Sequence, residues 1–255
     1  MSTTVRGVCA VVGCGPGLGG SVAVKFAKEG YAIAAMNRTA ETFAPTEALL
    51  KEMGANFGFY PADVTDEASV KEAFAKAKSE LGEVNVLVYN CGGGGFGIKP
   101  LDIKAADFRR SFDVSCTGAL FCAQAVLPDM LASKGFGPED HRFKKKGTLL
   151  FSSATSAFRG SAGTAQFACG KFALRALSQS IAKAYSKEGI HACHVRLDAV
   201  LDIPKTRARA PEMYEAGKLA DTDHIAETYY ALHQQSLLAL SNEIDIRPFQ
   251  EGWSL

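Results

Sequence analysis

The chain has 255 residues, with 28 lysines and arginines against 27 acidic residues, so that its formal net charge is +1. This length is enough for one large α/β domain with a well-filled core. The near balance of charge argues against a nucleic-acid-binding protein, since such proteins carry a basic excess or a basic stripe. The longest basic run, residues 144–146, is typical of a solvated loop.

Three further features narrow the class of protein. No apolar run approaches the length of a membrane span, and the N-terminal residues do not have the pattern of a signal peptide. The seven cysteines are scattered without a C-x-x-C pair, which favours reduced thiols in the cytoplasm. The five histidines include no H-E-x-x-H motif, so no metal site is expected. We therefore expect a soluble cytoplasmic protein that binds neither nucleic acid nor membrane.

Short apolar runs alternate with segments of helical periodicity along most of the chain. The runs that predict strands are 8–12, 31–36, 56–60, 84–89, 149–151, 192–197 and 243–246. The segments that predict helices are 18–28, 46–53, 66–81, 104–130 and 163–186. This alternation requires right-handed crossovers between strands. It predicts one doubly wound parallel sheet of six or seven strands with helices on both faces, in a single domain over residues 1–255.

A glycine-rich turn follows the first predicted strand and opens the first predicted helix. It contains Gly13, Gly17 and Gly19, and Leu18 begins the helix. Glycines at this place let the backbone turn tightly and approach a pyrophosphate, which binds the free N–H groups of the helix N-terminus. A glycine-rich turn without a ligand is the alternative, but the strand before it and the helix after it favour a Rossmann-type dinucleotide site.

The end of the second predicted strand indicates which dinucleotide would bind. An NAD-specific site places an acidic residue here to bind the ribose 2′-hydroxyl, whereas this chain has Asn37 and Arg38. No carboxylate is present to repel a 2′-phosphate, and a guanidinium is available to pair with it. The alternative is that Arg38 is a solvated loop residue. We favour NADP(H) as the cofactor.

Two further motifs bring a known family into view. Asp63-Val64 follows the third predicted strand, and Asn90-Cys91-Gly92 ends the fourth. With the glycine-rich turn, they resemble the T-G-x-x-x-G-x-G, D-V and N-N-A-G patterns of the short-chain dehydrogenase/reductase family, over residues 8 to about 201. The resemblance implies that Asp63 and Val64 contact adenine, and that Asn90 and Gly92 lie beside the cofactor.

The catalytic half of the chain departs from that family. The family pattern is Tyr-x-x-x-Lys on a helix, with a Ser about 13 positions earlier and an Asn on the preceding long helix. Here Lys171 is present, but Phe167 takes the place of the Tyr, and Ser115 takes the place of the Asn. Ser153 lies 14 positions before Phe167 and Thr155 lies 12 before it. The resemblance implies a catalytic set of Ser153, Lys171, Ser115 and Phe167, with Lys171 also holding the nicotinamide ribose.

Two functions follow from this set. The first is an NADP(H)-dependent oxidoreductase for carbonyl or alcohol-type small molecules, with its proton supplied by water, Ser153, Thr155 or the substrate itself. The second is an NADP(H)-binding sensor or assembly subunit without turnover. Asp198, which replaces the usual Pro after the sixth strand, is either an acid or a loop cap. We expect substrate specificity from the loops 92–100 and 198–217, and a homodimer or homotetramer paired through helices around 120–130 and 172–185.

Overall fold

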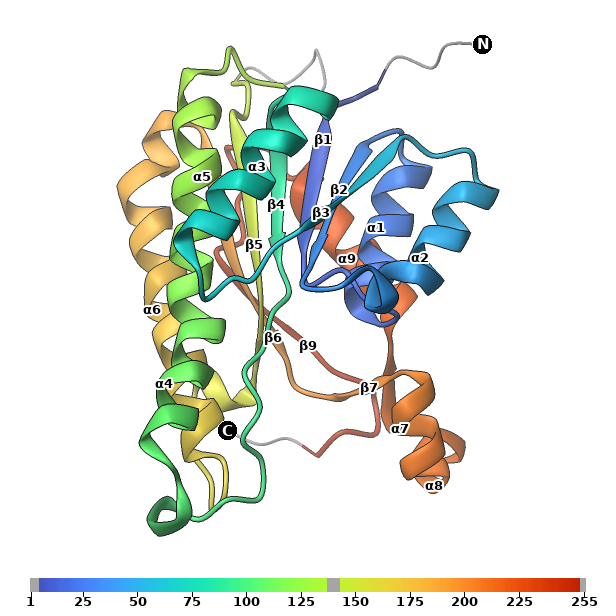
Figure 1. Cartoon of the computed structure of the whole chain (residues 1–255), viewed down its shortest axis with the longest axis vertical. Helices are drawn as coiled ribbons and strands as arrows, with labels where there is room; N and C mark the ends of the chain where they lie inside the picture. Colours follow the sequence, from blue (N-terminus) through green and yellow to red (C-terminus); the bar gives the residue numbers. More distant parts are fainter. Residues whose placement is uncertain (1–4, 137–142, 253–255) are drawn as a thin grey trace.

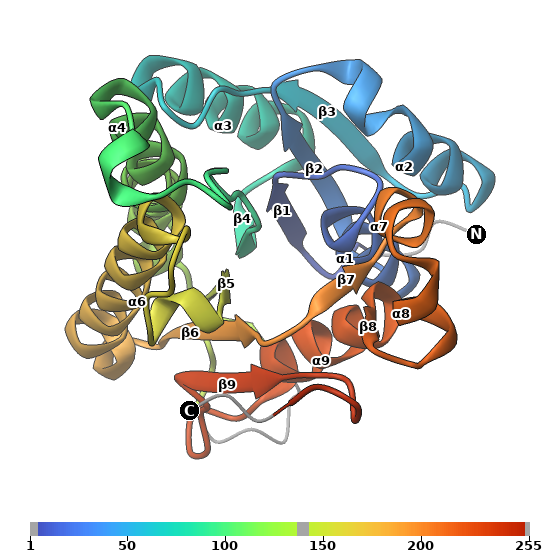
Figure 2. The same ribbon diagram turned by 90° about the horizontal axis from the view of Figure 1, so that it is seen from below.

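The computed structural model describes residues 5–136 and 143–252, and it is built around a seven-stranded parallel sheet with strand order β3-β2-β1-β4-β5-β6-β9 (Figures 1 and 2). The strands of this sheet are β1 (Val8–Val12), β2 (Ala32–Asn37), β3 (Phe57–Pro61), β4 (Val84–Tyr89), β5 (Gly147–Ala154), β6 (Ile190–Leu197) and β9 (Glu243–Ile246). Two short strands, β7 (Val200–Asp202) and β8 (Leu219–Asp221), pair with each other in a separate parallel sheet. The doubly wound fold predicted from the sequence is confirmed.

Helices cover both faces of the large sheet (Figure 1). The helices on one face are α1 (Leu18–Lys28), α2 (Ala40–Glu52) and α9 (Thr222–Gln234). Those on the other face are α3 (Glu67–Leu81), α4 (Ala105–Phe112), α5 (Gly118–Ala132) and α6 (Ala165–Tyr185). Two short helices, α7 (Pro204–Arg209) and α8 (Pro211–Glu215), lie beyond the carboxyl ends of the strands.

The central strands are apolar along their whole length because both of their faces are covered. In β1, the side chains of Val8, Ala10 and Val12 belong to one core cluster. Cys9 and Val11 belong to the cluster on the opposite face, as the alternation of side chains along a strand requires. This is why the strand reads as an unbroken apolar run in the sequence.

Helix α2 begins earlier than its sequence suggests. We expected it to start at Thr46, after Pro45, but it starts at Ala40 and includes the proline. Proline removes one helical hydrogen bond. Phe43 and Leu50 are nevertheless buried beneath the helix, and this packing offsets the loss.

Two other segments differ from expectation. The predicted loop 198–217 contains β7, α7 and α8, and α9 follows it without having been predicted. The basic run 144–146 is not fully solvated, because Lys145 is only 5% exposed and its Nζ donates a hydrogen bond of 2.6 Å to the His233 carbonyl. That carbonyl lies in the last turn of α9, where free C=O groups favour a cation.

Helices α4 and α5 form one continuous helical stretch, interrupted by a π-helical turn at Asp113–Thr117. Contrary to the sequence expectation, the stretch Ala105–Ala132 is long and apolar enough by length and composition to cross a membrane, the one such helix among the described residues. A core helix passes the same test. Ala119, Cys122 and Ala123 are fully buried within the large core cluster, as befits a helix packed on the sheet.

Candidate cofactor and active site

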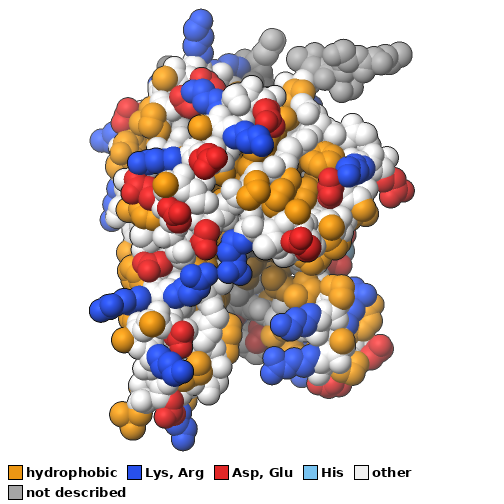
Figure 3. All heavy atoms as spheres, viewed as in Figure 1, with side chains coloured by type: hydrophobic (Ala, Val, Ile, Leu, Met, Phe, Trp, Pro, Cys, Tyr) orange, Lys and Arg blue, Asp and Glu red, His pale blue; other side chains and the backbone are white. Residues whose placement is uncertain are grey.

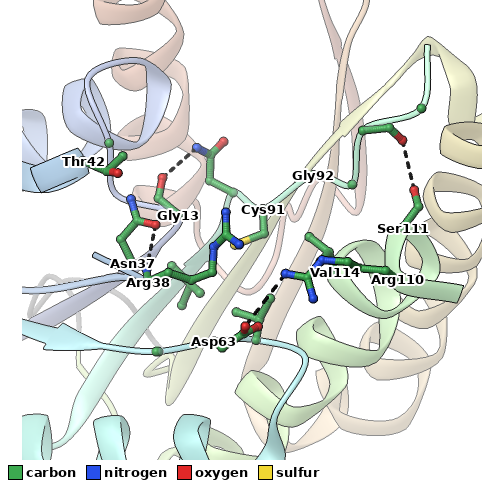
Figure 4. A pocket seen from close by; sticks show the side chains of 18 of the residues that line it. Gly13, Asn37, Arg38, Thr42, Asp63, Cys91, Gly92, Arg110, Ser111 and Val114 are labelled. Atoms are coloured by element: carbon green, nitrogen blue, oxygen red, sulfur yellow. Dashed lines mark hydrogen bonds and ion pairs between the residues drawn. The ribbon is translucent and has the colours of Figure 1, made fainter. Parts of the chain in front are cut away.

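A cavity of about 520 Å³ lies at the carboxyl ends of β1 to β4. The predicted cofactor-binding residues that line it are Gly13, Asn37, Arg38, Asp63, Val64, Asn90 and Gly92 (Figure 4). The strand order reverses between β1 and β4, so this is the topological switch point of the sheet. Ligands of open α/β sheets bind in such a crevice.

The glycine-rich turn brings three parts of the backbone close together. Gly13 has a φ of +85°, and a Cβ on it would lie 2.8 Å from the Asn90 carbonyl oxygen. A Cβ on Gly19 would lie 2.2 Å from the Gly13 carbonyl oxygen. Gly17, Leu18 and Gly19 do not line the cavity itself. Gly13 and Gly19 shape the turn, because neither of their close approaches would tolerate a side chain.

The N-terminus of α1 fits an anionic ligand. Its N-cap, Gly17, makes no side-chain capping hydrogen bond, and the first turn contains no acidic residue. The helix dipole and the free N–H groups therefore favour a negative charge at this end. The residues present fit the pyrophosphate of a dinucleotide.

Positive charge enters the cavity from two sides. Figure 4 shows Arg38, at the end of β2, and Arg110, on α4, on opposite sides of the cavity with Asp63 between them. Asn37 holds the turn before Arg38, because its Oδ1 accepts from the Arg38 N–H at 2.9 Å and its Nδ2 donates to the Cys14 carbonyl at 3.3 Å. In Figure 3, lysine and arginine side chains lie along the left side of the hollow on this face.

Asp63 is held in its charged form. Its Oδ1 accepts hydrogen bonds from the backbone N–H of Thr65 at 3.0 Å and from the Thr65 hydroxyl at 2.7 Å. The backbone hydrogen bond is the main cause that keeps the pKa of Asp63 below its usual value. Arg110 lies 3.9 Å from the other carboxylate oxygen and adds a smaller effect.

Two residues that differ from the family pattern, Tyr89 and Ser115, link the end of β4 to the π-helical turn at Asp113–Thr117. Tyr89, in place of the first Asn of the motif, donates its hydroxyl to the Val114 carbonyl at 2.5 Å. Ser115, in place of the family Asn, is fully buried, and its Oγ accepts from the Gly93 N–H at 3.2 Å. The structure therefore places Ser115 where it supports the loop after β4 instead of facing a cavity.

Lys171 is buried beneath the same loop. Its Nζ donates to the carbonyls of Cys91 at 3.2 Å and Ser152 at 2.9 Å. Only 4% of its surface is exposed, and this burial lowers its pKa to about 8. Its Nζ lies 5.6 Å from the centroid of the Phe167 ring. The structure thus places Lys171 beside Phe167, as the family pattern implies.

A second cavity of about 310 Å³ lies at the end of β5. Ser153, Thr155 and Phe167 are among the residues that line it. Thr155 Oγ1 donates a short hydrogen bond to Asp198, and Arg247 pairs with the same carboxylate at 3.2 Å. Asp198 is 4% exposed and lines neither cavity, an arrangement that favours the loop-cap interpretation over a direct acid.

The polar residues of the first cavity that sequence reasoning missed include Arg110, Ser111 and Gln166. Ser111 donates to the Gly94 carbonyl at 3.2 Å, and Gln166 precedes Phe167 on α6. None of them lies at the end of a strand. Their places depend on how α4 and α6 pack, and the periodicity of the sequence does not report that.

The open parallel sheet, the glycine-rich turn and the switch-point cavity define a dinucleotide-binding protein of Rossmann type. The family model described as short chain dehydrogenase matches residues 7–207. The chain belongs to the short-chain dehydrogenase/reductase family, whose members bind a nicotinamide cofactor.

Individual relatives agree with this assignment. The chain is 26% identical to the 3beta-hydroxysteroid dehydrogenase of Mediterraneibacter gnavus over 203 residues, covering 80% of this chain and 69% of the relative. It is 32% identical to the 7alpha-hydroxysteroid dehydrogenase of Escherichia coli K12 over 130 residues, about half of each protein. A crystal structure of a short-chain dehydrogenase from Rhodopseudomonas palustris superimposes with a TM-score of 0.79 and 26% identity, covering 96% of this chain and 100% of that one.

Proposed function

We propose that this protein is an NADP(H)-dependent oxidoreductase that transfers hydride to or from a carbonyl or alcohol-type small molecule, with an atypical source of the proton. The observation that carries the proposal is the first cavity, where Arg38 stands at the end of β2 and no carboxylate occupies that position. Arginine pairs with phosphate through two parallel hydrogen bonds, which suits a ribose 2′-phosphate.

The residues that would hold the cofactor lie in or beside the first cavity. The turn of Gly13, Gly17, Leu18 and Gly19 would present the N-terminus of α1 to the pyrophosphate. Asn37 and Arg38 would bind the 2′-phosphate, and Asp63 and Val64 would contact adenine. Asn90 and Gly92 would lie beside the nicotinamide ribose, with Lys171 buried behind them. When bound, the cofactor supplies or accepts the hydride.

The protein must then stabilise the substrate oxygen and supply its proton. Phe167 has no hydroxyl, so it cannot act as the family Tyr does. Ser153 is one of the residues that line the second cavity, and its Oγ is buried with no hydrogen-bond partner in the protein. Its hydroxyl is free to donate to a substrate carbonyl, where a developing negative charge strengthens the bond. Ser115 and Lys171 support the loop and the floor of the site through their bonds to Gly93 N–H, Cys91 O and Ser152 O.

The proposal is tested in two steps. Calorimetric titration measures the Kd values of NADPH and NADH, and tighter NADPH binding is expected. The absorbance of bound NADPH is then followed after addition of aldehydes, ketones, quinones and enones, and its decay is expected with at least one carbonyl class. Tighter NADH binding would refute the cofactor assignment.

A second function is favoured by Phe167 itself. Loss of the family hydroxyl while the cofactor cavity is retained suits an NADP(H)-binding sensor or assembly subunit. Tight NADPH binding without oxidation by any member of the panel would establish this alternative.

We also propose that the protein is a cytoplasmic homodimer or homotetramer. Leu120 on α5 and Phe172 on α6 are large apolar side chains more than a third exposed on the helices expected to pair. All seven cysteines are free, as in a reducing compartment. Sedimentation at micromolar concentration tests the assembly, and a monomer would contradict it.

A further inference from the structure

Three polar side chains meet at the carboxyl ends of β5, β6 and β9. These strands are neighbours in the sheet (Figure 2), and they pair in register up to their last residues. Thr155, Asp198 and Arg247 are the first residues beyond the three strands. Parallel pairing therefore brings together three residues that lie far apart in the sequence, at the edge of the sheet where ligands of this fold class bind.

Asp198 links the other two residues. One of its carboxylate oxygens accepts the Thr155 hydroxyl, and the other lies 3.2 Å from the Arg247 guanidinium. The Asp198 N–H donates to the Ile246 carbonyl at 2.9 Å, which fixes this residue beside β9. A second guanidinium nitrogen of Arg247 donates to Asp245 at 3.1 Å. These contacts form one chain from the last strand of the sheet to the end of β5.

The chain of contacts holds the 3₁₀ turn Thr155–Ala157, which follows Ser153 at the end of β5. Thr155 fixes the beginning of the turn through its bond to the carboxylate. Phe158 ends the turn, and its ring centroid lies 4.2 Å from the guanidinium carbon of Arg196, which is itself paired with Asp245. Both ends of the turn are therefore tied to charged groups of β6 and β9.

The buried ion pair is better suited to fixing a geometry than to stabilising the fold. The cost of removing two charges from water offsets most of their attraction, so that a buried pair adds little net stability. A carboxylate with partners on two sides nevertheless has one preferred direction, and the hydroxyl that donates to it is fixed in turn. The family pattern has a proline in place of Asp198, and a proline could not bond the turn after β5.

We propose that Asp198 and Arg247 are positioning residues, which hold the 3₁₀ turn after β5, and Ser153 before it, in the geometry that hydride transfer requires. Neither residue lines the first or the second cavity, so both act through Thr155. Their part in the reaction rests on the proposed function. Their control of the turn is independent of that function and can be measured without cofactor or substrate.

Amide hydrogen exchange of the full chain, followed by NMR, tests the control of the turn. The Phe158 N–H donates to the Thr155 carbonyl at 2.9 Å, so its exchange reports opening of the turn. Arg247→Met and Thr155→Val cut the chain of contacts at two different links, and each should speed this exchange at least about fivefold, the usual effect of one hydrogen bond. Arg247→Lys, which keeps the charge, should restore most of the protection. Exchange of the Asn90 N–H, which donates to the Val12 carbonyl at 2.8 Å, should not change.

The part in the reaction is tested by the kinetics of NADPH oxidation with a carbonyl compound that the wild type reduces. Arg247→Met and Thr155→Val should each lower kcat at least about tenfold, because small misplacements of reacting groups are costly, and should leave the KM of NADPH unchanged. The double variant should be no slower than the slower single variant, because both changes break the same chain. A purely structural role would instead leave kcat per folded molecule unchanged.

Lys25→Met is the matched control for the loss of a cation that bridges two carboxylates. Lys25 lies 2.7 Å from Glu29 and 2.6 Å from Glu227, and its side chain is 15% exposed against 12% for Arg247. It joins α1 to α9 and has no contact with the turn. The variant should therefore leave both the exchange of the Phe158 N–H and kcat unchanged. Circular dichroism verifies that each variant is folded.

Arg247→Met leaves a buried carboxylate without its cation, whereas Thr155→Val leaves the ion pair intact, so the second variant decides if the first does not fold. Unchanged exchange at Phe158 in folded variants would overturn the inference. Faster exchange with an unchanged kcat would also overturn it, because the turn would then have no part in the reaction. If no carbonyl compound oxidises NADPH in the wild type, the proposed function fails, and the exchange rates alone decide whether Asp198 and Arg247 hold the turn.

Discussion

Replacement of Arg38 by Ala removes the one feature on which the choice between NADPH and NADH depends. The Arg38 side chain is exposed at the rim of the first cavity, and its backbone is held by Asn37. A charge-assisted hydrogen bond contributes about 1.5 to 3 kcal/mol when it is shielded. Exposure to solvent reduces this, so we expect a loss of about 1 to 2 kcal/mol, which is a five- to thirtyfold rise in Kd.

Calorimetric titration of both cofactors into the wild type and the variant measures this loss. The Kd of NADPH should rise and that of NADH should change little, because NADH has no 2′-phosphate. Arg110→Ala is the matched control on the opposite side of the cavity. Arg110 lies beside Asp63, which we propose contacts the adenine common to both cofactors, so this variant should affect NADPH and NADH equally.

The reasoning would be refuted if Arg38→Ala weakened both cofactors by the same factor. It would also be refuted if the Arg110→Ala variant lost NADPH selectively. In that case the 2′-phosphate would lie on the α4 side of the cavity, and Arg38 would be the solvated loop residue of the alternative interpretation.

Three other predictions follow from the same geometry. Phe167→Tyr should oxidise NADPH faster than the parent with generic carbonyl substrates, because Lys171 Nζ, 5.6 Å from the centroid of the Phe167 ring, would stabilise the new phenolate. A folded variant no faster than the parent would show that proton delivery does not pass through this position. Gly19→Ala should lower the free energy of unfolding, measured in urea, by about 1 to 3 kcal/mol, since the new Cβ would lie 2.2 Å from the Gly13 carbonyl oxygen. Gly54→Ala is the control for the backbone effect alone, because no atom lies within 4 Å of the Cβ that it would add. Burial lowers the pKa of His191 to about 4 and that of His233 to about 3, whereas in the unfolded chain each histidine has its usual pKa of about 6.5, so the unfolded chain binds more protons between these values. The free energy of unfolding should therefore fall as the pH drops from 6.5 to 4, by about 1.4 kcal/mol per pH unit for each histidine. His191→Gln should reduce that slope, and an unchanged slope would contradict the assignment.

The strands, and the gathering of the residues at their ends in one cavity, could be predicted because the information is local. A strand buried on both faces is an apolar run, and the residue that follows it lies at the carboxyl edge whatever the rest of the fold does. Gly13, Asn37, Asp63 and Asn90 all follow or end such runs, and all line one cavity. Helix α3 was equally clear, since Asp66 caps it through the Ala68 N–H.

The parts that could not be predicted depend on contacts between distant segments. Lys145 lies in a basic run that resembles a solvated loop, but the end of α9 supplies a carbonyl 88 positions away. Asp198 was ambiguous because Arg247 reaches it only through the pairing of β6 with β9. Arg110 and Gln166 line the first cavity because of the way α4 and α6 pack.

The most direct measurement of the central claim is the transfer of deuterium from the nicotinamide ring of deuterated NADPH to a carbonyl compound. The wild-type protein is mixed with deuterated NADPH and an uncharged ketone or aldehyde, and the product alcohol is analysed by mass spectrometry. An NADP(H)-dependent oxidoreductase gives an alcohol that carries one deuterium on the former carbonyl carbon. Tight NADPH binding with no deuterium in any alcohol, across aldehydes, ketones and enones, would contradict the account and establish a cofactor-binding protein without turnover.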